Sequence, residues 1–156
     1  MSQSAPCPLC QTDGGIVVWR GADFRLIHAE DALLPAFYRV VWTAHVAEFS
    51  DLSALQRLSC MDAVALAEQT LRTQLQPDKI NLASLGNVVP HLHWHVIARW
   101  RWDAYWPQSA WSAPQREADA PRLRAIRAAL PNVNAALQAA FTARFGAASV
   151  QCQSAA

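Results

Sequence analysis

Histidines at alternate positions restrict the fold of this chain more than any other feature. Residues 91–95 read HLHWH, so that His91, His93 and His95, three of the five histidines, are separated by single apolar residues. Side chains alternate across a β-strand and rise about 3.3 Å per residue, so the pattern predicts a strand over 91–100 with three imidazoles on one face, about 6 to 7 Å apart. Because buried polar rings without partners are costly, this row of imidazoles indicates a functional site.

Other runs of branched and aromatic residues predict the rest of a sheet; they span 16–20, 24–28, 38–43 and 79–84. Apolar residues recur every three or four positions from Cys60 to Leu75, which predicts one long helix that begins after Ser50 or Asp51 and stops at Pro77. The predicted fold class is α+β, an antiparallel sheet of about five strands with one long helix packed on it.

The chain changes in composition after residue 101. Residues 102–114 are rich in tryptophan, tyrosine and proline and lack periodicity, which predicts a loop wrapped over the sheet or over a partner chain. One helix is predicted from Pro121 and a second after Pro131. We therefore divide the chain into a domain over 1–101 and a helical C-terminal extension over 102–156 that is not an independent domain.

Length and charge exclude several classes of protein. A chain of 156 residues corresponds to one domain. Thirteen Lys and Arg against twelve Asp and Glu give a net charge of +1, which supplies no long-range field for nucleic acid, so a phosphate ligand must be held locally. No stretch approaches the roughly 20 apolar residues of a membrane span, and the N-terminus lacks the features of a leader. We expect a soluble, cytoplasmic protein with no membrane partner.

Two chemistries suit a row of imidazoles. Histidines two positions apart can bind one zinc ion if a third ligand comes from elsewhere, which would make the row a catalytic metal centre. Alternatively, a neutral imidazole attacks phosphorus while its neighbours donate hydrogen bonds to the developing charge. An ordinary pKa of about 6.5 leaves much of a histidine population neutral near pH 7. The residues by themselves leave both chemistries open.

The pattern His-apolar-His-apolar-His-apolar-apolar resembles the signature of the histidine triad (HIT) superfamily of nucleotide hydrolases and transferases. The resemblance runs from Cys7 to Arg99 and includes the segment NLASLGN at 81–87. More narrowly, the chain is similar to bacterial HIT hydrolases of the diadenosine polyphosphate hydrolase-like group. The resemblance implies a HIT-like fold, a homodimer, and action at the α-phosphate of a nucleoside phosphate conjugate or dinucleoside polyphosphate, with no cofactor required for the chemistry.

The resemblance also assigns roles to individual residues. It implies that His93 is the nucleophile and forms a nucleotidyl-histidine intermediate through its far nitrogen, while a backbone carbonyl holds its near N–H. His95 and His91 would support it through phosphate contacts and orientation. Asn81 matches an amide that contacts the sugar-phosphate portion of the nucleotide, and His28 falls where several relatives place a further histidine near the nucleotide.

The turn before the first histidine adds two expectations. Backbone N–H groups at Gly86 and Asn87 could cradle an anion beside the imidazoles, as glycine-containing nests do. One branch of relatives carries Ser or Thr where this chain has Val88, so protonation of the leaving group must come from another group or from water. This departure leaves open an alternative function, a nucleotide-binding regulatory module with little or no catalysis.

Cys7 and Cys10 form a Cys-x-x-Cys pair, the usual half of a structural zinc site. The resemblance implies two histidine ligands for such a pair, and the matching positions are His45 and His91. Thiolate and imidazole suit zinc, and the site would pin the N-terminal tail to the sheet; the alternative is a pair of surface thiols on a disordered tail. If zinc is bound, His91 leaves direct phosphate contact and the other two histidines of the row carry the chemistry.

Overall fold

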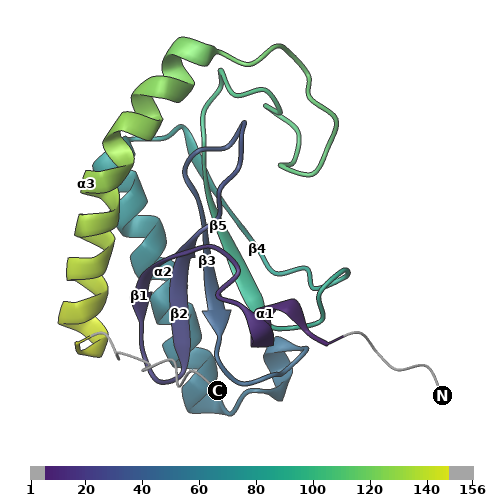
Figure 1. Ribbon diagram of the computed structural model, residues 1–156, viewed down its shortest axis with the longest axis vertical. Coiled ribbons are helices and arrows are strands. Elements are labelled where there is room, and N and C mark those ends of the chain that lie inside the picture. The colour runs from purple at the N-terminus through teal and green to yellow at the C-terminus, as the bar shows by residue number, and fades with distance from the viewer. Residues whose placement is uncertain (1–5, 148–156) are drawn as a thin grey trace.

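The computed structural model describes residues 6–147 of the chain (Figure 1). Its five strands form one antiparallel sheet in the order β1-β2-β3-β5-β4. The strands are β1 (Ile16–Arg20), β2 (Phe24–His28), β3 (Phe37–Trp42), β4 (Lys79–Ala83) and β5 (His93–Arg99). The helices are α1 (Pro8–Gln11), the 3₁₀ helix η1 (Phe49–Asp51), α2 (Ala54–Leu75) and α3 (Ala120–Phe145). The predicted α+β class with a HIT-like sheet and one long packed helix is confirmed.

Helix α2 begins later than its sequence suggests. Ser53 caps it, because its hydroxyl accepts from Gln56 N while the Gln56 side chain accepts from Ser53 N. The predicted start after Ser50 or Asp51 is therefore wrong, since those residues belong to η1. The buried side of α2 covers one face of the sheet.

Helix α3 is continuous through Pro131, so the prediction of two helices separated at this proline is wrong. A proline inside a helix removes a hydrogen bond and costs about 3 kcal/mol. That cost is offset because Leu123, on the N-terminal side of the proline, and Val133, Leu137 and Phe141, on its C-terminal side, are all buried along one stripe of the helix. Helix α3 runs alongside α2 and packs against β1 (Figure 1).

The two faces of the sheet have different partners. On β5, Trp94, Val96 and Ala98 point into the core shared with the helices. His93 and His95 alternate with them and therefore lie on the opposite face. That second face is the one that carries the candidate site. Within the part of the chain described, no helix is both long and apolar enough to cross a membrane.

Candidate active site

The strand that carries the imidazoles begins at His93, so the prediction that it begins at His91 is wrong by two residues. His91 N donates to Val89 O at 2.8 Å, which turns the backbone sharply at Pro90 before the strand starts. The ring of His91 is directed elsewhere: its Nε2 donates to Trp42 O at 2.7 Å, and the side chain is fully buried. The structure therefore places two histidines, not three, on the open face of the strand.

His93 is held in one tautomer. Its Nδ1 lies 2.6 Å from His91 O, and because a carbonyl only accepts, Nδ1 carries the proton. Nε2 is therefore unprotonated in the neutral ring. Burial lowers the pKa of His93 below its ordinary value, against the opposing effect of that hydrogen bond. The arrangement leaves a neutral imidazole with a free lone pair on Nε2.

His95 lies next to His93, with 4.7 Å between the ring centroids. Its ring contacts Phe37 at 5.3 Å and Trp111 at 5.1 Å, both edge to face. Burial, helped by the neighbouring His93, lowers the pKa of His95 to about 3. Its Nδ1 is buried and has no hydrogen-bond partner among the described residues. A buried polar atom of this kind is satisfied when a ligand or water binds beside it.

His93 and His95 line a cavity of about 540 Å³. Its other walls come from residues between 8 and 14, from the turn 85–89, and from Trp111 in the loop that follows β5. This volume lies within the range of ordinary small-molecule sites, about 300 to 1,000 Å³. Segments far apart in the sequence thus enclose the two histidines.

Helix α1 and the residues after it are tied to the sheet by a buried arginine. The Arg25 guanidinium donates to Leu9 O at 2.8 Å and to Asp13 O at 3.0 Å. Leu9 also packs against Ile27 and Val41 on the open face of the sheet. The N-terminal segment is therefore a fixed wall of the cavity.

The turn before the histidines brings Gly86 and Asn87 to the cavity, at the place where the sequence predicts an anion contact. Gly86 has a φ of +75°, in the left-handed region that favours glycine. Val88 also lines the cavity, but its side chain is 93% exposed and carries no hydroxyl. The turn supplies backbone groups and one amide side chain to the cavity, and no acidic proton from a side chain.

Arg39 is a cavity residue that the sequence analysis did not single out. It lies on β3 directly opposite His95 in the antiparallel register, and its side chain lines the same cavity. Burial lowers the pKa of its guanidinium. The signal was available, because Arg39 is the one charged residue in the otherwise apolar run 38–43.

Asn81 lies on β4 and lines a neighbouring cavity of about 510 Å³, with Trp111 shared between the two cavities. Its Oδ1 accepts from Arg99 Nη1 at 2.7 Å. Arg99 also forms a buried, bidentate ion pair with Asp103, at 2.7 and 3.0 Å. Asp103 in turn accepts from three backbone N–H groups of the following loop, those of Trp100, Tyr105 and Trp106. This network fixes the loop that leads to Trp111.

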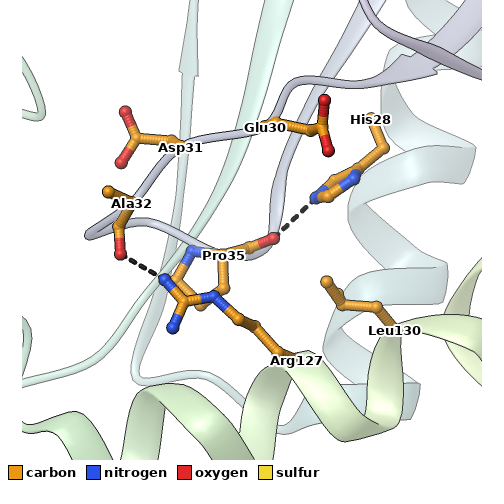
Figure 2. Close-up of a pocket in the computed structure, with 7 residues that line it drawn as sticks. All are labelled: His28, Glu30, Asp31, Ala32, Pro35, Arg127 and Leu130. Atoms are coloured by element: carbon orange, nitrogen blue, oxygen red, sulfur yellow. Dashed lines mark hydrogen bonds between the residues drawn. The ribbon is translucent and has the colours of Figure 1, made fainter.

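His28 lies on the other face of the sheet from His93 and His95, and the expectation that it contacts the nucleotide stays a prediction. It has the same parity as Phe24 and Leu26, which point into the helix-covered core. Its Nε2 donates to Pro35 O at 2.7 Å, at the edge of a separate pocket of about 380 Å³ that Arg127 of α3 also lines (Figure 2). His28 has no part in the cavity of His93.

The two cysteines and the two other predicted ligands meet at one point. Ligand atoms of Cys7, Cys10, His45 and His91 all lie within 4.8 Å of one another. Cys10 Sγ is 3.3 Å from His45 Nδ1 and 3.4 Å from His91 Nδ1, and the two Nδ1 atoms are 3.4 Å apart. The structure thus brings together the four residues that the sequence predicts as metal ligands.

The chemistry of this cluster fits zinc. Ligands at zinc–sulfur distances of about 2.3 Å and zinc–nitrogen distances of about 2.0 to 2.1 Å form a tetrahedron with edges of about 3.4 to 3.8 Å, near the separations observed. The bond from His91 Nε2 to Trp42 O leaves its Nδ1 unprotonated, as a ligand must be.

Elsewhere in residues 6–147 no group of three or more potential ligands gathers, and neither His93 nor His95 belongs to this one. Among the described residues, the row of histidines therefore offers too few neighbouring ligands for a catalytic metal centre.

Comparisons with known proteins show which proteins the chain is similar to. The model of the HIT domain family matches residues 15–101. A histidine triad protein from Bradyrhizobium japonicum is 30% identical, with a TM-score of 0.63 over 77% of this chain and 90% of its own. One from Sinorhizobium meliloti is 26% identical, with a TM-score of 0.62 over 77% and 90%. A zinc-bound histidine triad family protein from Mycobacterium smegmatis shares the fold, with 19% identity and a TM-score of 0.50 over 85% and 89%. No curated protein matches significantly.

Proposed function

The chain belongs to the HIT domain family, and from this premise we propose that it is a nucleotide hydrolase or nucleotidyl transferase. It acts at the α-phosphate of a nucleoside phosphate conjugate or dinucleoside polyphosphate. The observation that carries this proposal is the tautomer of His93. The hydrogen bond from Nδ1 to His91 O leaves Nε2 unprotonated, on a side chain that lines a cavity large enough for a ligand.

In the proposed reaction, His93 Nε2 attacks the α-phosphorus while the bond from phosphorus to the leaving group breaks. The product is a nucleotidyl-histidine. Water then attacks the same phosphorus, the phosphorus–nitrogen bond breaks, and a nucleoside monophosphate is released. An aligned nucleophile and donors aimed at the phosphoryl oxygens supply most of what phosphoryl transfer needs.

The other histidines have different supporting roles. His95, which stays neutral at pH 7 because its pKa is lowered to about 3, donates a single hydrogen bond to a phosphoryl oxygen. His91 acts through its backbone carbonyl, which orients His93, and not through its ring. Gly86 and Asn87 offer further donors from the turn. Because Arg99 occupies Asn81 Oδ1, the amide N–H groups of Asn81 are the part left to contact the nucleotide.

We also propose that Cys7, Cys10, His45 and His91 bind zinc. The zinc-bound relative supports this assignment. The ion would be structural, cross-linking helix α1 to the turn before β5, and the reaction would not pass through it. Loss of the ion would loosen the N-terminal wall of the cavity.

A homodimer remains part of the proposal. In the sheet order, β4 is an edge strand, and such an edge presents unpaired backbone groups that a second copy could cover. Leu82 on β4 and Leu85 just after it are exposed apolar side chains at this edge. Light scattering on the protein as it elutes from a size-exclusion column measures its molar mass. Twice the mass of one chain supports the homodimer, and the mass of one chain contradicts it.

The test of the function is to trap the intermediate. The protein is mixed with nucleoside phosphoramidates and dinucleoside polyphosphates, quenched without acid and digested for mass spectrometry. The wild type should carry a nucleotidyl group on His93, and His93→Ala should lose turnover by about three orders of magnitude or more while keeping nucleotide binding. Arg124→Gln, at an exposed position on α3, is the control and should keep its activity.

Two results would count against the enzyme. Turnover retained by His93→Ala would exclude His93 as the nucleophile. Saturable nucleotide binding by the wild type, without adduct or turnover, would favour the regulatory module instead.

A further inference from the structure

We propose that Arg39 binds an anionic leaving group, so that the substrate carries a second phosphoryl group next to the α-phosphate. The preferred substrates are then nucleoside polyphosphates or dinucleoside polyphosphates, and not conjugates that release a neutral amine. This inference rests on the proposed function and narrows its substrate class.

Arg39 lies on β3, two residues along the strand from the residue that pairs with His93. In the antiparallel register of β3 and β5, Val41 is opposite His93 and Arg39 is opposite His95. Both Arg39 and the two histidines line the same cavity. A group bonded to phosphorus at His93 therefore has the guanidinium and the His95 ring as its neighbours.

Arg39 is half-buried, and part of its guanidinium lacks a partner. Its Nε is buried and has no hydrogen-bond partner within residues 6–147. Over the same residues, no carboxylate lies within ion-pair distance of it. The guanidinium carbon lies 5.2 Å from the centroid of the Phe37 ring, which supports the cation from one side and does not satisfy Nε. A ligand anion would satisfy this atom, because planar arginine donors match the oxygens of a phosphate.

Two buried polar atoms point to the same ligand. His95 Nδ1, like Arg39 Nε, is buried without a partner in the described structure, and the two residues are cross-strand neighbours. Buried polar atoms without partners are uncommon in folded proteins. Their occurrence side by side, on the wall of one cavity, indicates a site for a group rich in oxygen atoms.

The charge of the cavity is consistent with an anion of more than one phosphoryl group. Among the described residues that line it, Arg39 is the one with a permanent charge, and no lining residue is acidic. The protein as a whole, at +1, adds no strong field. Attraction of a phosphate therefore depends on this one side chain.

The proton donors of the cavity favour the same leaving group. The Thr12 hydroxyl donates to Pro8 O at 3.0 Å and is therefore occupied, and Val88 and Val89 have no proton to give. An amine must be protonated as its bond to phosphorus breaks, whereas a phosphate leaves as an anion and takes up a proton later from water. In this step the His93 nitrogen–phosphorus bond forms, the phosphorus–oxygen bond breaks, and its electron pair stays on the departing phosphate beside Arg39.

Measurements of ligand affinity test this inference without relying on turnover. Affinities are measured by calorimetry for a nucleoside monophosphate and for its α,β-methylene diphosphate, which cannot be cleaved, using the base that the wild type binds best. The wild type should bind the diphosphate analogue at least tenfold more tightly. Arg39→Gln should lose about 10- to 100-fold for the analogue and about twofold or less for the monophosphate, because a hydrogen bond to a charged group is lost. Arg39→Lys should recover part of the loss.

Arg124→Gln is the control, because it removes one positive charge from an exposed position on α3. It should bind both ligands as the wild type does. An equal loss for both ligands in Arg39→Gln would place Arg39 at the α-phosphate and overturn the inference. A wild type without preference, or one that binds neither ligand, would overturn it as well.

Turnover gives an independent measurement. The ratio of kcat/KM for a dinucleoside polyphosphate to that for a phosphoramidate should fall at least tenfold in Arg39→Gln. A ratio that does not change overturns the inference and leaves the proposed function intact, since the His93 adduct would still form. Absence of the adduct in every variant is the separate failure of the proposed function.

Discussion

His91 and His93 are separated by one residue, and yet they serve two different sites. His91 Nε2 donates a hydrogen bond to Trp42 O, and its Nδ1 then faces the sulfur atoms of Cys7 and Cys10. His93 Nδ1 donates a hydrogen bond to His91 O, which leaves Nε2 unprotonated on a side chain that lines the cavity. In each case one backbone carbonyl selects the nitrogen that remains available. The comparison teaches that the choice of tautomer, and not the choice of residue, decides whether the free ring nitrogen faces the cysteines or the cavity.

The largest expected effect is on metal affinity. His91→Ala removes a ligand, so zinc affinity should fall by more than the 10- to 100-fold typical of losing an outer hydrogen-bond partner. His93→Ala should bind zinc as the wild type does, because its ring has no place in the cluster. Zinc is measured by competition with a chelating dye. An equal loss of zinc affinity in the two variants would contradict the assignment of His91, and not His93, to the metal cluster.

A second large effect concerns the network behind the cavity. Asp103→Ala leaves the Arg99 guanidinium, 1% exposed, without its carboxylate. Removing one partner of such a buried pair costs about 3 to 5 kcal/mol, seen as a lower free energy of unfolding in urea. Asp78→Ala breaks a surface pair with Arg101 and should cost about 1 kcal/mol or less. The zinc content should be unchanged in both variants. Loss of zinc in Asp103→Ala would show that the Arg99–Asp103 network also supports the metal cluster.

Stability should decline in acid because of the cavity histidines. His95 has a folded pKa of about 3, against about 6.5 when unfolded. Below pH 6.5 the unfolded chain binds a proton that the folded chain refuses, so the free energy of unfolding falls by about 1.4 kcal/mol per pH unit from this group. Above pH 6.5 the term vanishes. His95→Gln should flatten the slope between pH 6 and 5, and an unchanged slope would contradict this origin.

The smallest expected effect concerns the thiol of Cys60 in α2, which should not react with an alkylating reagent. Burial in α2 raises the pKa of Cys60 to about 11, so its thiol stays protonated at pH 8. Iodoacetamide should leave Cys60 unmodified with or without a chelator, and should modify Cys7 and Cys10 only once the metal is removed. Peptide mapping reads each thiol separately. Labelling of Cys7 and Cys10 at the same rate in both conditions would contradict a metal in that cluster.

Much of the fold could be predicted from the sequence, because periodicity and breakers act locally. The strands before His91, the long helix and the four clustered ligands follow from such signals together with the family resemblance. One difference, the continuous helix through Pro131, has a signal in the sequence. Apolar residues recur every three or four positions on both sides of Pro131, at Leu123, Ile126, Leu130, Val133 and Leu137, and this periodicity favours one helix.

The remaining differences depend on tertiary contacts. The turn at Pro90, which removes His91 from the strand, is stabilised by pairing of Leu92 with Val46 O and with Trp42 N, in a part of the chain remote in sequence. The position of Trp111 depends on its packing against Phe37 of β3 and His95 of β5. No local pattern contains either contact, so neither could be predicted from residue types and spacing.

The wall that Trp111 gives to the cavity has a consequence for ligand selection. The family match ends at residue 101, whereas Trp111 comes from the segment beyond it. A substitution in that segment would change the cavity beside His93 and leave the matched domain unchanged. The ligand preference of this protein should therefore depend on residues beyond 101 as well as on the histidine motif.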